Sequence, residues 1–349
     1  MTRSTKTEPN LTRRARFAYA IIAGALAAAF LLFVEYRSDE LGPGGSDFDQ
    51  LWFAARALWR GANPYALIGP GRSLDWRWPF VYPLSTAVAF LPFAIFPVLV
   101  ARVAFTSLSA ALLTFALSRR GRGVLVVLLS ASMLDAVRTA QLSPLLTAGV
   151  LLTGLAFVFP LKPHTGLPLV VAGARPRAIA IAAISGLAIT AVAFALQPDW
   201  VREWLHALRQ TIHFRAPVFA VGGPLLLLAV LRWRRLDARV LLACVCVPHT
   251  PTVYDVLPLA LAVRTFREGF AFASLTHAAL FLQLVHVATE PNGAAPSRAA
   301  NILNLCVYLP VLAAILLRPN EGPAPVWLEQ FIARTPAWLR GRPSPASPA

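Results

Sequence analysis

Two carboxylates near the start of the chain are the residues whose types and surroundings most directly suggest chemistry. Asp47 and Asp49 lie in the segment 44–49, Gly-Gly-Ser-Asp-Phe-Asp, shortly after the first apolar stretch. Glycines allow close approach to the backbone, and carboxylates accept hydrogen bonds from hydroxyl groups. If the apolar stretch spans a membrane, these carboxylates lie at the membrane surface, where lipid headgroups and water-soluble groups meet. Carboxylates at such a place indicate a functional site.

Each carboxylate also has a structural explanation. Ser46 and Asp49 have the spacing of a capping box, in which two side chains bind the free amide groups at a helix start. The helix dipole favours an acidic residue at the first helical position, which is where Asp47 would lie. Asp49 is therefore predicted to be the cap, and Asp47 is the stronger candidate for a functional carboxylate.

A helix is expected to position these residues. Over 47–60 the apolar residues recur at helical spacing, with Trp52 and Trp59 in the same register. The predicted apolar face consists of Leu51, Ala54, Ala55 and Leu58. We expect this amphipathic helix to lie along the membrane surface, outside the membrane-spanning part of the chain.

The composition assigns the chain to the polytopic α-helical membrane proteins. Of its 349 residues, 57% are hydrophobic and 14% are charged, and several apolar runs approach the ~20 residues that a membrane-spanning helix needs. The net charge of +16 includes arginine clusters between apolar runs, which is typical of cytoplasmic loops. We therefore expect membrane lipids as partners and no nucleic acid.

The chain divides into a basic cytoplasmic N-terminus (1–16), a transmembrane domain (17–318) and a cytoplasmic tail rich in Pro and Ala (319–349). The domain is predicted to be an all-α helical bundle with about 8–10 spans, and 37–80 is its first external loop. The apolar stretches are 17–34, 81–97, 99–118, 123–137, 142–160, 178–196, 217–231, 239–263, 269–288 and 300–318.

In two of these stretches, prolines bear on the predicted topology. A full crossing at 81–97 would place the arginines of 119–122 on the outside, against the positive-inside tendency. We therefore interpret 81–97 as a broken or re-entrant segment packed against protein. The sequence Pro-His-Thr-Pro at 248–251 interrupts the last long stretch before Arg264, and we place this break at the outer interface.

Several short motifs occur in a characteristic order along the chain. They are Asp47-Phe48, Ala54-Ala55-Arg56-Ala57-Leu58, Gly61-Ala62-Asn63-Pro64-Tyr65, Phe80-Val81-Tyr82-Pro83-Leu84, Ala140-Gln141, Lys162-Pro163-His164, Pro248-His249 and Tyr254-Asp255. This order resembles glycosyltransferase family 87, over about residues 17–265. Ala140 stands where the family usually has glycine, and the interval from Gln141 to Lys162 is short for two crossings.

The resemblance implies a fold and a reaction. Family members are membrane enzymes of the GT-C class that take mannose or a related sugar from a polyprenyl-phosphate donor. An aspartate in their first external loop acts as general base in an inverting transfer, and that role maps onto Asp47. Because polyprenyl phosphate is a good leaving group, one carboxylate can suffice. The implied partners are this donor and a glycolipid or glycan acceptor, at the outer face of a bacterial inner membrane.

The remaining motif residues are candidates for binding the donor phosphate or sugar hydroxyls. They are Arg56, Tyr82, Gln141, Lys162, His164, His249, Tyr254 and Asp255. Neither a cofactor nor a metal ion is predicted, because the histidines form no metal-binding pattern. Structural roles remain open for several of them: an interfacial anchor for Lys162 or Tyr82, a helix-end hydrogen bond for His164, and a helix cap for Asp255.

Two other functions remain open at this point. Lys162, His249 and Asp255 could instead form a charged pathway through broken helices, as in a transporter or flippase for a lipid-linked or small anionic substrate. A catalytically silent membrane scaffold is the other alternative, because Ala140 and the short middle section depart from the family pattern.

Overall fold

The computed structural model describes residues 11–37, 46–211, 214–289, 295–322, 329–330 and 333–334. It is 76% helical, and its strands β1 (Ile68–Gly69) and β2 (Leu74–Asp75) form one short parallel pair. The predicted all-α polytopic fold is confirmed. The predictions for residues 1–10, for most of the tail and for Gly44 and Gly45 concern residues outside the described ones.

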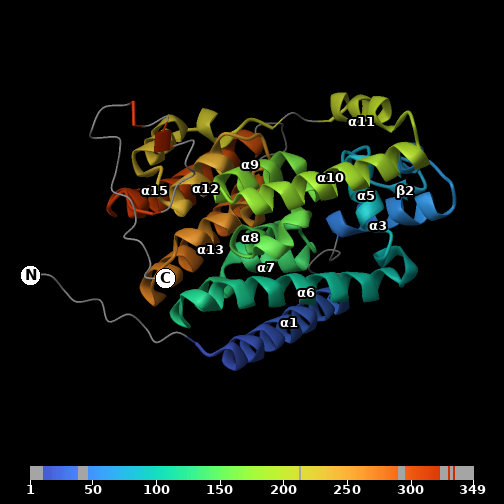
Figure 1. Cartoon of the computed structure of the whole chain (residues 1–349). Coiled ribbons are helices and arrows are strands. Elements are labelled where there is room, and N and C mark those ends of the chain that lie inside the picture. The colour runs from blue at the N-terminus through green and yellow to red at the C-terminus, as the bar shows by residue number, and fades with distance from the viewer. Residues whose placement is uncertain are drawn as a thin grey trace, which may run out of the picture.

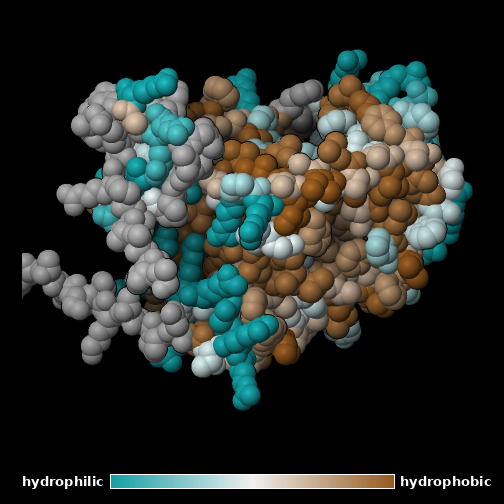
Figure 2. Space-filling model, viewed as in Figure 1, coloured by the Kyte–Doolittle hydropathy of each residue, from teal (hydrophilic) through white to brown (hydrophobic). Residues whose placement is uncertain are grey.

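Five helices in the described part are long and apolar enough to cross a membrane. They are α1 (Arg13–Tyr36), α6 (Val98–Leu117), α10 (Pro176–Leu196), α13 (Phe266–Thr289), and the continuous run of α14 (Ala295–Leu303), a π-helical turn (Asn304–Tyr308) and α15 (Leu309–Leu316). Hydrophobic residues cover the middle of the molecule in the view of Figure 2, as expected of a surface that faces lipid.

The helices α1 and α6 lie side by side and run in opposite directions (Figure 1). Arg16, near the start of α1, donates hydrogen bonds to the Phe115 carbonyl at 2.9 Å and to the Ser118 hydroxyl at 3.2 Å, near the end of α6. The arginines at 119–122 therefore lie on the same side as the N-terminus. The segment between the two helices does not cross the membrane.

That intervening segment contains α5 (Leu84–Ala89) and a 3-10 turn at Phe93–Ile95. Residues 84–88 of α5 are all buried in protein. The interpretation of 81–97 as a broken segment packed against protein is confirmed, because the prolines end each helical piece after at most two turns.

Short helical segments replace the crossings expected at 123–137 and 142–160. They are a 3-10 helix (η3, Gly123–Leu129), α7 (Ala131–Arg138), α8 (Ser143–Leu151), a second 3-10 helix (η4, Thr153–Leu161) and α9 (Pro163–Gly173). The chain reverses at Gln141, at Leu152 and again at Lys162. At this last turn a Cβ on Gly166 would lie 2.0 Å from the Phe159 carbonyl oxygen, so the close approach of the two arms requires glycine.

The stretch 239–263 is also a hairpin, made of α12 (Leu236–Val245) and a 3-10 helix (η7, Val253–Ala262). A ten-residue α-helix is about 15 Å long, which is roughly half the hydrocarbon core. Asp237 at the start of the hairpin pairs with Arg264 just beyond its end at 3.4 Å, and with Arg318 at 3.0 Å. The hairpin thus enters and leaves at the same end of the molecule.

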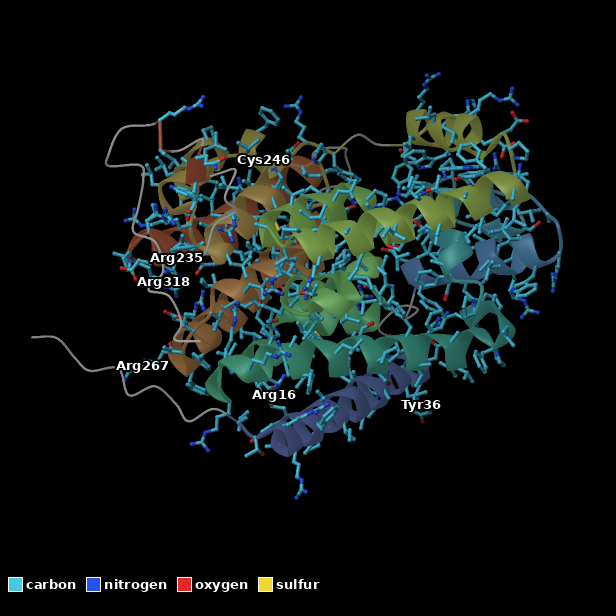
Figure 3. All side chains as sticks on the ribbon, in the orientation of Figure 1. Arg16, Tyr36, Arg235, Cys246, Arg267 and Arg318 are labelled. Atoms are coloured by element: carbon cyan, nitrogen blue, oxygen red, sulfur yellow. The ribbon has the colours of Figure 1, made fainter. Side chains whose placement is uncertain are left out.

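The first loop and the segment after α10 form the opposite end. There α3 (Ser46–Trp59) lies near α4 (Pro64–Leu67), the β pair and α11 (Trp200–Arg209) (Figure 1). The face of α3 predicted to be apolar is buried, as expected: Leu51, Ala54, Ala55 and Leu58. Figure 3 shows Tyr36 toward this end. Arg235, Arg267 and Arg318 lie at the other end, which we call the arginine-rich end.

Candidate functional site

Asp47, in the first turn of α3, receives hydrogen bonds from two distant parts of the chain. The Gln141 side-chain amide donates to its Oδ2, and the Tyr254 hydroxyl lies 3.4 Å from the same oxygen. Burial raises the pKa of the Asp47 carboxyl above 3.8, while the Gln141 hydrogen bond and the charge of Lys162 act in the opposite direction. The carboxylate is thus held and made more basic.

Gln141 reaches Asp47 because of how α7 ends. The Ala140 amide donates to the Val137 carbonyl at 3.1 Å and the Gln141 amide to the Ala136 carbonyl at 2.8 Å, which is the Schellman pattern. This pattern requires a left-handed residue, and Ala140 has φ of 47°. The left-handed turn explains why glycine is usual at this position in the family and directs Gln141 toward α3.

Lys162 and Asp255 form a buried ion pair beside Asp47. The Lys162 Nζ lies 2.8 Å from Asp255 Oδ1, and the two side chains are 8% and 3% exposed. Lys162 also lies over the Tyr254 ring, 5.4 Å from its centre. Because an ammonium group has three donors, the pair with Asp255 leaves hydrogen-bonding capacity for a ligand. Tyr254 connects the lysine to Asp47, since its ring faces one and its hydroxyl the other.

The positions of Lys162 and Asp255 are fixed by their neighbours. The Thr86 hydroxyl on α5 donates to the Leu161 carbonyl at 2.9 Å, just before Lys162. The Thr252 hydroxyl lies 3.3 Å from Asp255 Oδ2 at the tip of the α12–η7 hairpin. The reversal at Lys162 and the tip of this hairpin therefore meet at one place.

Tyr82 joins this group through the motif at 61–65. Asn63 caps α4 by accepting from the Tyr65 amide at 2.9 Å, and the Tyr65 hydroxyl donates to the Tyr82 carbonyl at 2.9 Å. The Trp204 indole on α11 donates to the Val81 carbonyl at 2.8 Å. Tyr82 is close enough to Asp47 and Asp255 to feel their charge.

The histidines border the cluster. His249 Nδ1 lies 2.9 Å from the Val247 carbonyl, so this nitrogen carries the proton. Its Nε2 lies 3.2 Å from the Tyr308 hydroxyl, from which it can accept. His164, exposed in the first turn of α9, interacts electrostatically with Lys162 and His249. Both rings are thus near the lysine, and His249 is held by two structural hydrogen bonds.

Asp49 differs from the prediction that it caps α3. Both of its oxygens bind the Arg102 guanidinium on α6, with Nε at 2.7 Å from Oδ1. The same guanidinium donates to Glu35 at 2.8 Å. Arg102 is only 7% exposed and lies in an apolar helix. It therefore binds the Asp49 carboxylate more strongly than the free amide groups at the start of α3 would. The side chain of Ser46, the predicted partner of Asp49, lies outside the described residues.

Sequence reasoning missed Arg102, although a signal was present. It lies one turn inside the apolar helix α6, and a charged residue there is costly unless it is paired. Asp135 was missed as well. It pairs with Arg138 at 2.8 Å on α7 and lies close enough to Asp255 to interact with its charge.

Arg56 is not brought into the cluster by any interaction between described residues. Its guanidinium lies over the Trp52 ring, 4.9 Å from the centre, one turn back on α3.

The cluster combines a carboxylate of raised pKa with a buried ammonium group and two tyrosine hydroxyls. Such a set can accept a proton at Asp47 and stabilise an anion at Lys162. Among the described residues, no group of three or more His, Cys, Asp or Glu side chains is placed to hold a metal ion.

The model of Glycosyltransferase family 87 matches residues 80–247. This region contains Tyr82, Gln141 and Lys162, whereas Asp47 and Asp255 lie outside it. The comparison with curated proteins finds no match, and neither does the comparison with solved structures. The resemblance noted in the sequence is confirmed by this match: residues 80–247, slightly less than half of the chain, are similar to glycosyltransferase family 87.

Proposed function

We propose that the protein transfers a hexose, mannose in our assignment, from a polyprenyl-phosphate donor to a glycolipid or glycan acceptor with inversion. The observation that carries the proposal is the convergence of Asp47, Gln141, Tyr254 and the Lys162–Asp255 pair. These residues come from four separate segments of the chain. A purely structural cap would need none of these distant partners.

In the proposed step Asp47 is the general base. The acceptor hydroxyl oxygen attacks the anomeric carbon and forms the new glycosidic bond, and its proton passes to the Asp47 carboxylate. The bond between the anomeric carbon and the phosphate oxygen breaks on the opposite face, and polyprenyl phosphate leaves with the electron pair. No proton is needed on the leaving group, because phosphate already carries negative charge well.

Lys162 is the proposed ligand of the donor phosphate. Its ion pair with Asp255 uses one of three donor positions, and Tyr82 and Tyr254 lie beside it with hydroxyl groups that can donate to phosphate or to sugar oxygens. Gln141 would orient Asp47. His164 and His249 would contribute hydrogen bonds at the edge of the phosphate site.

The proposed location of the site is the extracytoplasmic face of the bacterial inner membrane, with the N-terminus in the cytoplasm. This follows from the positive-inside tendency, since Arg16, Arg235 and Arg318 lie toward the opposite end from α3, the helix that carries Asp47 (Figures 1 and 3). The match to a glycosyltransferase family supports transfer over the transporter and scaffold alternatives.

The donor class can be tested with the purified protein in detergent. Labelled polyprenyl-phosphate mannose is incubated with a lipid and glycan extract of the source membranes, and release of polyprenyl phosphate is measured alongside transfer of label. We expect protein-dependent release of the lipid phosphate with label in a new product. Equal transfer from a nucleotide-activated mannose, without release from the lipid donor, would refute the proposed donor.

A further inference from the structure

An apolar groove of about 840 Å³ lies at the arginine-rich end, between α1, α6 and the turn from α8 to η4. Phe17, Leu112 and Leu152 are among the apolar side chains that line it. Of the described residues in its lining, Arg119 and Arg175 are the charged ones, and no carboxylate is among them. The groove therefore combines an apolar wall with positive charge.

Within the described part of the chain, no carboxylate forms a salt bridge with the arginines at this groove. Arg16 lies close enough to Arg119 and to Arg13 for its charge and theirs to repel. None of the salt bridges between described residues includes Arg16, Arg119 or Arg175. The nearby cluster around Asp237 is different, because that carboxylate pairs with three arginines. Like charges held together at an apolar surface favour an anion among them.

The two arginines are directed by the local structure. Arg175 donates to the Leu151 carbonyl at 3.0 Å and to the Thr153 hydroxyl at 3.3 Å, which holds its guanidinium beside the turn that forms one wall. Arg119 is exposed at the end of α6. An arginine fork binds phosphate oxygens well in this partly dehydrated setting.

We propose that this groove binds an anionic phospholipid of the leaflet at the arginine-rich end, with acyl chain in the groove and phosphate between Arg119 and Arg175. The sugar donor does not fit this description. Arg16 and Glu35 are separated along α1 by a rise of about 28 Å, and Glu35 shares Arg102 with Asp49 beside the catalytic cluster. A phosphate held at this groove is therefore far from Lys162.

Thermal unfolding in a zwitterionic detergent tests the proposal. Phosphatidylglycerol and phosphatidylcholine with the same chains are titrated into the purified full-length protein, and the melting temperature is followed. We expect phosphatidylglycerol to raise the melting temperature more than phosphatidylcholine, and inorganic phosphate alone to have no effect. Arg119→Gln should weaken the apparent phosphatidylglycerol affinity about fivefold, and the double variant Arg119→Gln/Arg175→Gln further.

Arg267→Gln is the matched control, because Arg267 is exposed at the same end but does not line the groove. This variant should respond to phosphatidylglycerol as the wild type does. Equal losses in Arg119→Gln and Arg267→Gln would show a general charge effect and overturn the site. Equal stabilisation by phosphatidylglycerol and by a neutral polyprenol would overturn the anionic headgroup and indicate an isoprenoid chain instead.

Discussion

Asp47 accepts hydrogen bonds from residues that lie 94 and 207 positions away in the sequence. The surroundings of Asp47 act in opposite directions on its pKa. Burial favours the protonated acid, whereas the Gln141 amide and the Lys162 charge favour the carboxylate. The net result is a pKa above 3.8, which makes the carboxylate a better proton acceptor than an ordinary aspartate.

The pH dependence of transfer follows from this pKa. A base works when deprotonated, so the rate should rise with pH through the raised pKa of Asp47 and the acid limb should lie above pH 3.8. Gln141→Leu removes the donor that favours the carboxylate. We expect its acid limb to move to higher pH in a profile of kcat/KM. An unchanged limb in this variant would mean that another group controls the titration.

Ala140 is a residue whose replacement should stabilise the protein. Its φ of 47° puts the backbone of Ala140 in the left-handed region. This conformation costs an L-residue with a Cβ about 1–2 kcal/mol. Ala140→Gly should therefore raise the free energy of unfolding by about 1 kcal/mol, reduced by the greater entropy of glycine in the unfolded chain. Chemical unfolding in mixed micelles measures the change. A destabilised variant would contradict the Schellman geometry at this turn.

At the scale of elements, Arg102 joins three helices near Asp47, the proposed base. It lies on α6 and binds Glu35 near the end of α1 and Asp49 on α3. Asp49 is two residues from Asp47, so the arginine fixes the start of the helix that carries the base. Arg102 thus acts as a positioning residue through Asp49.

Replacing Arg102 tests this role. Arg102→Met keeps the stem but leaves Glu35 and Asp49 as neighbouring carboxylates, and loss of one partner of a buried pair costs about 3 kcal/mol. We expect a lower free energy of unfolding, measured by chemical unfolding in mixed micelles. The combined variant Arg102→Met/Asp49→Asn/Glu35→Gln should recover part of the loss, because it also removes the unpaired charges. No recovery would show that packing of the arginine stem dominates.

The long helices could be predicted from the sequence, and the hairpins could not. Hydropathy located α1, α6 and α10 to within a few residues, because an apolar run of that length indicates a membrane-spanning helix. The same measure cannot separate a crossing from a buried hairpin, since both are apolar. The reversal of 236–264 depends on the pairing of Asp237 with Arg264, which is a tertiary contact.

The candidate site was predictable to a similar extent. The family resemblance named Asp47, Gln141, Lys162 and Asp255, and the structure brings these residues together. It could not supply the partner of Asp49, because local spacing suggested a cap while the true partner is on α6. Substrate binding by Arg56 stays a prediction, because the described contact of its guanidinium is with the Trp52 ring.

At the scale of the whole molecule, the two ends differ in charge and in role. The end with α3 and α11 carries the candidate site, and the other end carries the arginines that start or finish the apolar segments. Short hairpins between these ends position Gln141 and Asp255 without adding crossings. This arrangement places the proposed base and the arginine clusters at opposite ends of the molecule.

Single cysteines can test this arrangement, after the free cysteines Cys244, Cys246 and Cys306 are replaced. Arg202 is 80% exposed on α11, and Arg119 and Arg267 are exposed at the other end. We expect a membrane-impermeant maleimide to label Arg202→Cys in intact cells, and to label Arg119→Cys and Arg267→Cys only after lysis. Labelling of Arg119→Cys and Arg202→Cys from the same side would contradict the single crossing assigned to α6.

The central claim is that Asp47 removes the acceptor proton, and the turnover of Asp47→Asn tests it most directly. Asparagine retains an acceptor for Gln141 and Tyr254 but cannot act as a base. Burial raises the pKa of Asp47, so ionising this carboxyl in the folded protein lowers the free energy of unfolding as the pH rises. Asp47→Asn removes that charge, and the variant should therefore unfold at an equal or higher temperature.

The measurement is release of polyprenyl phosphate coupled to sugar transfer. Asp75→Asn is the control in the same loop, because Asp75 is exposed and accepts a hydrogen bond from the Gly71 amide. We predict that Asp47→Asn lowers turnover by about 100- to 10,000-fold, while Asp75→Asn retains wild-type turnover. Wild-type turnover in a folded Asp47→Asn protein would contradict the assignment of Asp47 as the base.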